Sequence, residues 1–151
     1  MSTPGVELIE LPPGDTGRER ARARARARGA AHVSRSYRTP LAAIAWHSSP
    51  VGVDLERVEP FTRSFAESIC TPDELEQIDS LAARDELVAS LWSGKEALAK
   101  ALGDALAYDP RRLQSPLMWP DGVCGRWRAR ALEALPEGYV GWLVWSEAPA
   151  A

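Results

Sequence analysis

Strand-like segments stand on both sides of a block of helix-like segments, and this order constrains the fold more than any other feature of the sequence. Short apolar runs at 41–46 and 51–55, separated by the turn-like residues 47–50, are typical of a hairpin of buried strands. Residues 125–132 alternate and residues 139–145 are continuous and aromatic, which predicts two more strands. Helices grouped between strand pairs predict an α+β fold with antiparallel pairing.

Two helices are predicted between these strand pairs. A threonine N-cap, a proline and a capping-box glutamate at 71–74 predict a helix over 72–81. A longer helix is predicted over 84–102, because leucines recur along one stripe and a glycine follows as the stop. The stripe consists of Leu87, Leu91, Leu98 and Leu102. We expect the antiparallel sheet to pack against this long central helix.

The chain has 151 residues and a mass of 16.5 kDa, which predicts one domain. Residues 1–17 are rich in proline and glycine and are expected to form a flexible lead-in. Residues 18–29 alternate arginine and alanine and end at a glycine, which predicts an arginine-rich helix. This helix would open a single domain over 18–146, followed by a tail at 147–151.

The arginine-rich segment makes the charge distribution uneven. Residues 1–40 hold eight arginines against four acidic residues, a surplus of +4, so the remainder carries −7 of a net charge of −3. Such an acidic body argues against nucleic-acid binding, since its field would repel phosphates. The segment is then either a solvated helix or a docking surface for an acidic protein partner.

The sequence also bears on where the protein works. No apolar run approaches the ~20 residues that cross a membrane, and the first residues lack the basic and apolar regions of a secretory signal. Two cysteines, Cys70 and Cys124, do not make a disulfide framework. We therefore expect a cytoplasmic protein with reduced thiols and no membrane partner.

Charged residues on one predicted strand and on the long helix could form a site. Asp54 and Glu56 are two residues apart on a strand and so share a face. Glu96 and Lys100 share a helix face at i, i+4. Taken separately, a pair like the first is most often a solvated pair of carboxylates, and the second is explained by a surface ion pair. Together with a diphosphate, the three carboxylates fit Mg²⁺, which takes one or two carboxylates and completes its shell with waters and phosphate oxygens.

Two segments resemble, in order and spacing, the signature motifs of the 4′-phosphopantetheinyl transferase superfamily, especially its surfactin-type branch: Val51-Gly-Val-Asp-Leu-Glu56 and Trp92-Ser-Gly-Lys-Glu-Ala-Leu-Ala-Lys100. The resemblance covers roughly residues 30–146. It implies the fold of that family and a Mg²⁺-dependent enzyme that moves 4′-phosphopantetheine from coenzyme A to a serine of an acyl or peptidyl carrier protein. Adenosine 3′,5′-bisphosphate would be released, and secondary metabolism is the expected setting.

The resemblance assigns roles by motif position. Asp54, Glu56 and Glu96 would hold Mg²⁺. Lys100, and with it Lys95, would hold a coenzyme A phosphate or stabilise the leaving group. Glu96 would also accept the serine proton, directly or through a metal-bound water.

Two departures from the family pattern stand out. Surfactin-type enzymes usually carry a Ser-His pair where this chain has Ser36 and Tyr37, so Ser36 and the following Arg38 would take the coenzyme A phosphate, Arg38 by a bidentate contact. The chain also corresponds to one half of a surfactin-type pseudo-dimer. We therefore expect a homo-oligomer, a trimer or otherwise a dimer. The tryptophans near the C-terminus either anchor such an interface or fill the core.

Two alternative functions remain open from the sequence. One is a protein of the same fold that has lost coenzyme A transfer and binds a carrier protein or acts as a scaffold. The other is a biosynthetic enzyme of different chemistry that reuses the carboxylate pocket. Catalysis is favoured over a scaffold by the joint occurrence of Asp54, Glu56, Glu96 and Lys100.

Overall fold

The computed structural model describes residues 3–11, Arg22, Arg24, Arg26, and residues 29–80, 84–103 and 108–147. Its strands are β1 (Gly5–Glu10), β2 (His32–Arg38), β3 (Leu41–His47), β4 (Val51–Arg57), β5 (Val123–Cys124), β6 (Trp127–Ala131) and β7 (Tyr139–Ser146). Its helices are α2 (Arg63–Ile69), α3 (Pro72–Ser80) and α4 (Arg84–Leu102), with 3₁₀ turns η1 (Pro110–Arg112), η2 (Pro116–Met118) and η3 (Pro120–Gly122).

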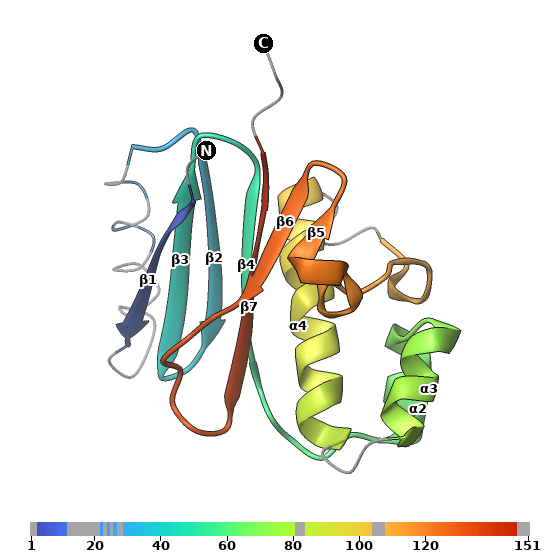
Figure 1. Ribbon diagram of the computed structural model, residues 1–151. Coiled ribbons are helices and arrows are strands. Elements are labelled where there is room, and N and C mark those ends of the chain that lie inside the picture. Colours follow the sequence, from blue (N-terminus) through green and yellow to red (C-terminus); the bar gives the residue numbers. More distant parts are fainter. Residues whose placement is uncertain are drawn as a thin grey trace.

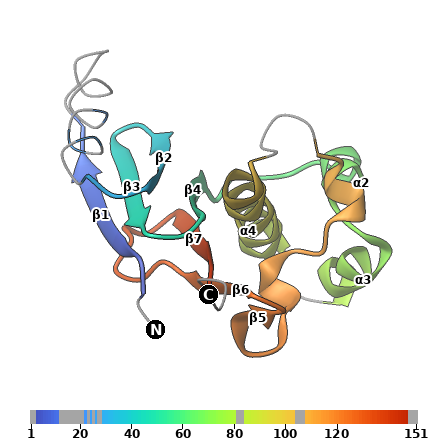
Figure 2. The same ribbon diagram turned by 90° about the horizontal axis from the view of Figure 1, so that it is seen from above.

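Two antiparallel sheets confirm the predicted α+β class. Their strand orders are β1-β3-β2 and β4-β7-β6-β5. The first sheet lies on one side of β4, and the three helices lie on the other side of the second sheet (Figures 1 and 2). The core between the sheets is built from apolar side chains of β3, β4 and β7.

The strands predicted at 41–46 and 51–55 are confirmed as β3 and β4, but their pairing as a hairpin is wrong. β3 pairs with β1 and β2, whereas β4 pairs with β7. Both strands are buried on both faces. An apolar run of that kind shows burial without indicating which strand lies beside it, which is why the partner was misassigned.

β2 lies beside β4 along a seam held by side chains. The hydroxyls of Ser34 and Ser36 accept hydrogen bonds from the backbone N–H groups of Val53 and Leu55, each at 3.0 Å. These buried N–H groups of β4 therefore bond to serine oxygens instead of to carbonyls of a neighbouring strand. The seam joins the two sheets at the strand that carries the carboxylates.

The expectation of a flexible lead-in over 1–17 is wrong for residues 5–10, which form β1 and pair with β3. Val6 and Leu8 pack against the core between the sheets, and Ile9 and Leu11 pack on the opposite face of the first sheet. Burial on both faces explains why this segment is ordered. Its short apolar pattern is obscured in the sequence by the prolines and glycines around it.

The predicted arginine-rich helix falls mostly outside the described residues, as does the remainder of the lead-in. Arg22, Arg24 and Arg26 are helical, and the Arg24 guanidinium lies 3.1 Å from the Glu7 carboxylate of β1. Gly29 follows with φ of +64°, the left-handed conformation that a glycine adopts readily after a helix.

The predicted capping box begins α3 at Pro72. The Thr71 N–H donates to the Glu74 carboxylate at 2.9 Å, and the Glu74 N–H donates to the Thr71 hydroxyl at 3.3 Å. The preceding helix, α2, was not predicted. Its N-cap is Thr62, whose hydroxyl accepts a hydrogen bond from the Phe65 N–H at 3.0 Å.

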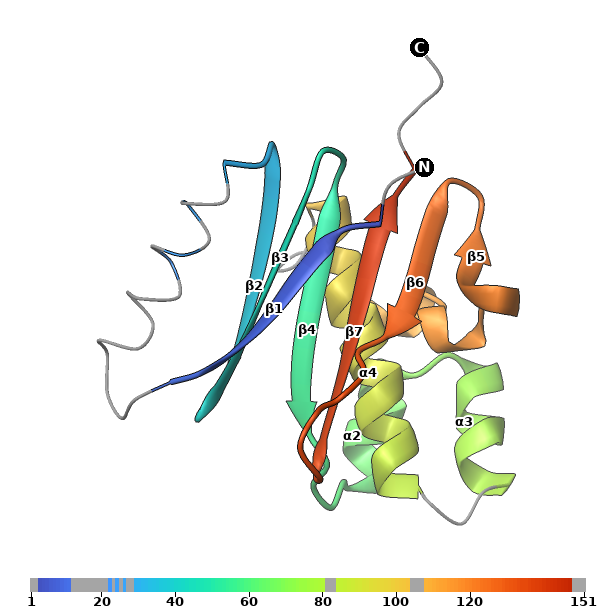
Figure 3. The same ribbon diagram turned by 60° about the vertical axis from the view of Figure 1, so that its left-hand side comes forward.

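α4 spans the predicted residues and ends at Leu102, directly before Gly103, whose φ is +85°. The helix runs along β4 and β7 (Figure 3). The predicted leucine stripe holds at Leu91 and Leu98, which are buried, and fails at Leu102, which is 42% exposed. In the described part of the chain, no helix has the length and apolar character needed to cross a membrane.

Gly52 allows α4 to approach β4 closely. A Cβ atom at this position would overlap the Ala97 carbonyl of α4. On β7, the buried Trp142 packs against the same helix and donates from its indole N–H to the Ser90 hydroxyl at 2.9 Å. For Trp142 the structure thus supports the core interpretation.

Candidate active site

The predicted site residues of β4 and α4 converge where the strand passes the helix. Asp54 and Glu56 are both buried on β4. Glu96 is half-buried on α4. The Lys100 ammonium lies 3.4 Å from Asp54 Oδ1. The charges of Glu56 and Glu96 both act on Asp54, so the three carboxylates form one electrostatic cluster.

Asp54 is the most deeply buried carboxylate of this cluster. Burial, followed by the charge of Glu56, raises the pKa of Asp54 to about 8, against the opposing effects of Lys100 and Arg38. Its Oδ2 atom is buried and has no hydrogen-bond partner among the described residues. Such an oxygen is costly unless a proton or a cation occupies the space beside it.

β2 supplies two further predicted site residues. Arg38 donates from its Nη2 nitrogen to both carboxylate oxygens of Glu56, at 2.7 and 2.6 Å, in an ion pair. Ser36 is buried at the seam, where its hydroxyl donates to Asp54 Oδ1 at 3.4 Å and accepts from the Leu55 N–H. The structure therefore gives Ser36 a role in orienting Asp54, whereas Arg38 lies at the open edge of the cluster.

Lys100 contacts both the seam between β2 and β4 and the carboxylate cluster. Its ammonium donates to the Val53 carbonyl of β4 at 2.8 Å and to the Arg35 carbonyl of β2 at 3.1 Å. With Asp54 as its third acceptor, all three hydrogens of the ammonium have acceptors. The positive charge stays beside the carboxylates while it bridges the two sheets.

The structure does not bring Lys95 to this site, which corrects its predicted contact with a phosphate. Lys95 is fully buried, forms an ion pair with Glu74, and donates to the carbonyls of Ile69 at 2.6 Å and Pro110 at 2.8 Å. Successive helical residues point about 100° apart. Lys95 consequently faces the helical side of the molecule, although the neighbouring Glu96 faces the cluster.

Tyr108 is a site residue that the sequence reasoning missed. Its hydroxyl donates to Glu96 Oε1 at 3.0 Å. Burial raises the pKa of Glu96, and the Tyr108 hydrogen bond and the Lys100 charge oppose that rise. Burial and the Glu96 carboxylate also raise the pKa of Tyr108 itself, so its hydroxyl remains a donor. A lone tyrosine between a helix and a 3₁₀ turn carries no sequence pattern that could have identified it.

The oxygen donors of the cluster suit a divalent cation. Three carboxylates supply only oxygen, which suits Mg²⁺, and the unsatisfied Asp54 oxygen is the atom that such a charge would satisfy. Among the described residues, no three His, Cys, Asp or Glu side chains already form a ligand set. Arg38 holds Glu56 and Tyr108 holds Glu96. The residues fit the ion: Glu56 would bind it on leaving Arg38, and Glu96 would bind it through the oxygen that Tyr108 does not hold.

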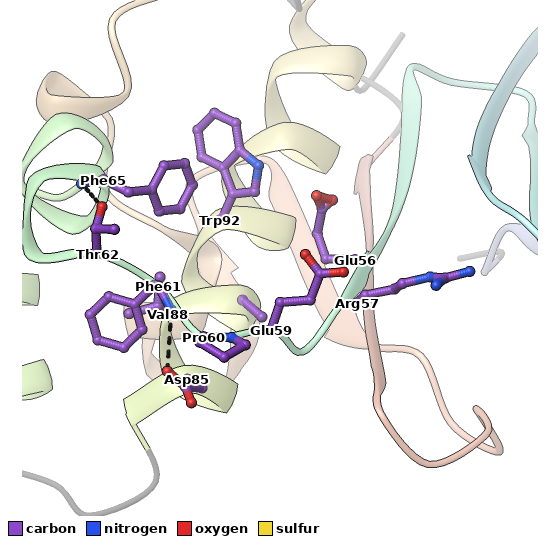
Figure 4. Close-up of a pocket in the computed structure, with 11 residues that line it drawn as sticks. Glu56, Arg57, Glu59, Pro60, Phe61, Thr62, Phe65, Asp85, Val88 and Trp92 are labelled. Atoms are coloured by element: carbon purple, nitrogen blue, oxygen red, sulfur yellow. Dashed lines mark hydrogen bonds between the residues drawn. The ribbon is translucent and has the colours of Figure 1, made fainter.

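A cleft of about 340 Å³ opens beside Glu56, between α4 and the segment that joins β4 to α2 (Figure 4). Phe65 of α2 and Trp92 of α4 face each other edge-to-face, with ring centroids 6.0 Å apart. The Asp85 carboxylate accepts a hydrogen bond from the Phe61 N–H at 3.4 Å. The cleft thus combines aromatic walls with acidic groups and is continuous with the carboxylate cluster through Glu56.

Comparison with known proteins agrees with the motifs. Residues 50–134, over half of the chain, match the model of the 4′-phosphopantetheinyl transferase superfamily. The chain is also 30% identical over 79 residues to a 4′-phosphopantetheinyl transferase, psf-1, of Bacillus pumilus, covering 51% of this chain and 34% of that protein. The chain therefore spans about a third of the length of this curated relative. On these grounds, the chain belongs to the 4′-phosphopantetheinyl transferase superfamily.

Proposed function

We propose that the chain transfers 4′-phosphopantetheine from coenzyme A to a serine of an acyl or peptidyl carrier protein, with Mg²⁺ held by Asp54, Glu56 and Glu96. The observation that carries this proposal is the cluster of three carboxylates, with an unsatisfied Asp54 oxygen, between the cations Arg38 and Lys100. Family membership supports the class of reaction.

The positive groups of the site would bind the diphosphate of coenzyme A. Mg²⁺ would supply the charge that neutralises the diphosphate oxygens. Arg38 would leave Glu56 and bind a phosphate through its planar guanidinium, which suits a bidentate contact. Lys100 would hold Asp54 and add positive charge on the side of the leaving group.

Glu96 is the proposed proton acceptor. Burial raises its pKa, which makes the carboxylate a stronger base. The serine oxygen forms a new bond to the phosphorus that carries the pantetheine, and Glu96 takes the serine proton. The diphosphate bond breaks, and adenosine 3′,5′-bisphosphate leaves. The aromatic cleft beside Glu56 would receive the pantetheine arm, since it begins where the diphosphate would lie.

The setting of the reaction is part of the proposal. We propose a homo-oligomer, a trimer or otherwise a dimer, in which a second copy completes the enclosure of coenzyme A. The proposed partners are a carrier protein and coenzyme A, with neither nucleic acid nor membrane involved. The cytoplasm and secondary metabolism are the proposed location and context.

Intact-mass spectrometry of an apo carrier protein incubated with the chain, coenzyme A and Mg²⁺ tests the transfer. The expected result is a mass gain of one phosphopantetheine, lost in Glu96→Ala and without Mg²⁺. Glu133→Ala, an exposed position outside the site, is the control and should leave the gain unchanged. No gain with several acyl and peptidyl carrier proteins, together with no calorimetric binding of coenzyme A, would refute the proposal and favour the non-transferring alternative.

A further inference from the structure

The segment from Tyr108 to Pro110 is anchored to α4 by two successive residues of that helix. Its hydroxyl binds Glu96 directly, at 3.0 Å. Two residues later, the Pro110 carbonyl accepts from the Lys95 ammonium at 2.8 Å. Lys95 and Glu96 are neighbours in the chain, so one turn of α4 holds this segment at both points. Asp109, between the two, caps η1 by accepting from the Arg111 N–H at 3.0 Å.

The anchor at Pro110 is rigid because it belongs to a buried polar network. Lys95 and Glu74 are fully buried. Glu74 also accepts from the Ser115 N–H at 2.7 Å, and the Ser115 hydroxyl donates to the Leu91 carbonyl at 2.9 Å. These contacts tie α3, α4 and the segment after α4 together. The backbone two residues after Tyr108 is thereby held by a network in the interior of the protein.

Glu96 needs such a partner because it is only half-buried and has three rotatable side-chain bonds. Ordering a glutamate side chain costs rotamer entropy. A hydrogen bond already present before a ligand binds removes part of that cost. Partners of ligating carboxylates typically contribute 10–100-fold in metal affinity.

We propose that Tyr108 is a positioning residue, which fixes the Glu96 carboxylate through Oε1 and leaves Oε2 as the oxygen offered to a divalent cation. This inference rests on the proposed function for the role of Glu96, and extends it to a residue outside both motifs. It also gives Lys95 an indirect role in the site, because its hydrogen bond to the Pro110 carbonyl holds the backbone two residues after Tyr108.

Mn²⁺ binding to the purified chain, measured by calorimetry without coenzyme A or carrier protein, tests the inference. Tyr108→Phe removes the hydroxyl and keeps the ring, so Mn²⁺ affinity should fall 10–100-fold. Tyr139→Phe is the matched control, because the Tyr139 ring lies near Arg57 on the rim of the sheet, and should stay within twofold of wild type. In a Glu96→Gln background, Tyr108→Phe should cause no further loss.

Several results would overturn the inference. One is an unchanged Mn²⁺ affinity in folded Tyr108→Phe, and another is an equal loss of Mn²⁺ affinity in Tyr139→Phe. A third is a full further loss of affinity when Tyr108→Phe is added to Glu96→Gln. Failure of Tyr108→Phe to fold would assign the hydroxyl to folding instead. A wild-type chain that binds no Mn²⁺ would overturn it too. Selective loss in Tyr108→Phe, with no transfer by wild type, would support the positioning role and refute the transfer alone.

Discussion

At the residue scale, this chain contains two kinds of buried charged group, which differ in whether all their polar atoms have partners. Lys95 and Glu74 are fully buried, yet backbone and side-chain partners surround both. Asp54 is also buried, but one of its oxygens has no partner among the described residues, and its neighbours include Glu56. The first arrangement is stable by itself and suits a structural role. The second is completed by a ligand and suits a site.

Lys95→Met should destabilise the fold by about 3–5 kcal/mol, because it leaves the Glu74 carboxylate buried without its counter-ion. Urea unfolding monitored by circular dichroism measures the free energy of unfolding. The matched control is the double variant Lys95→Met with Glu74→Gln, which removes the stranded charge and keeps an oxygen acceptor for Ser115. It should recover most of the loss. A double variant no more stable than Lys95→Met would contradict this account of the pair.

The two cysteines should differ strongly in reactivity. Cys70 is buried, and burial raises its pKa to about 11, whereas Cys124 is exposed. Since the thiolate is the nucleophile, a disulfide reagent should label one thiol quickly at pH 8, and Cys124→Ser should abolish that fast phase. Two equally fast thiols in the native protein would be inconsistent with the fold.

The raised pKa of Cys70 also has a consequence for stability. Between pH 9 and 11 the unfolded chain loses a thiol proton that the folded chain keeps, so this contribution to the free energy of unfolding decreases as pH rises. Comparing urea unfolding at pH 8 and pH 10 measures the decrease. It should be smaller in Cys70→Ala, and an equal decrease in both proteins would refute this assignment.

At the element scale, the site depends on how closely α4 lies against β4. Asp54 and Glu56 come from the strand, and Glu96 and Lys100 come from the helix. The serine seam and the Lys100 ammonium hold β2 at the other edge of β4. Each of these contacts involves segments far apart in the sequence, so the site exists only when the two sheets and the helix are assembled.

Gly52→Ala should separate α4 from β4 and cost about 1–3 kcal/mol or more, since its Cβ atom would overlap the Ala97 carbonyl. Gly94→Ala is the control within α4. The nearest atoms to its Cβ would be the Ser115 hydroxyl at 3.0 Å and the Pro116 ring at 3.2 Å, and alanine gains about 1 kcal/mol in helix propensity. We therefore expect Gly94→Ala to stay within about 1 kcal/mol of wild type in urea unfolding. Equal stability of the two variants would refute the close approach.

At the scale of the whole molecule, ligand binding should appear as stability. If Mg²⁺ binds the folded carboxylate cluster, a concentration 100 times its Kd should stabilise the fold by about 2.7 kcal/mol. Thermal unfolding with and without MgCl₂ measures this shift. Asp54→Asn removes a ligand charge and should abolish the response. An equal shift in wild type and Asp54→Asn, or none in either, would argue against a metal site here.

Local signals in the sequence determined the elements that depend on neighbouring residues. The capping box at 71–74 located the start of α3, and Gly103 the end of α4, because caps act within one helical turn. The period-2 geometry of β4 placed Asp54 and Glu56 together. The two motifs also predicted that Asp54, Glu56, Glu96 and Lys100 would meet at one site, and the structure brings these four together.

Only the tertiary structure decided which strand pairs with which, where Lys95 points, and that Tyr108 reaches Glu96. Strand pairing and hydrogen bonds across long separations depend on how whole elements pack, and an apolar run or a single tyrosine carries no information about its distant partner. The sequence therefore determined the chemical groups of the site and the elements that carry them. α4 packs against β4 on one face, and on another face its Lys95 pairs with the buried Glu74. This packing determined which of those groups face each other.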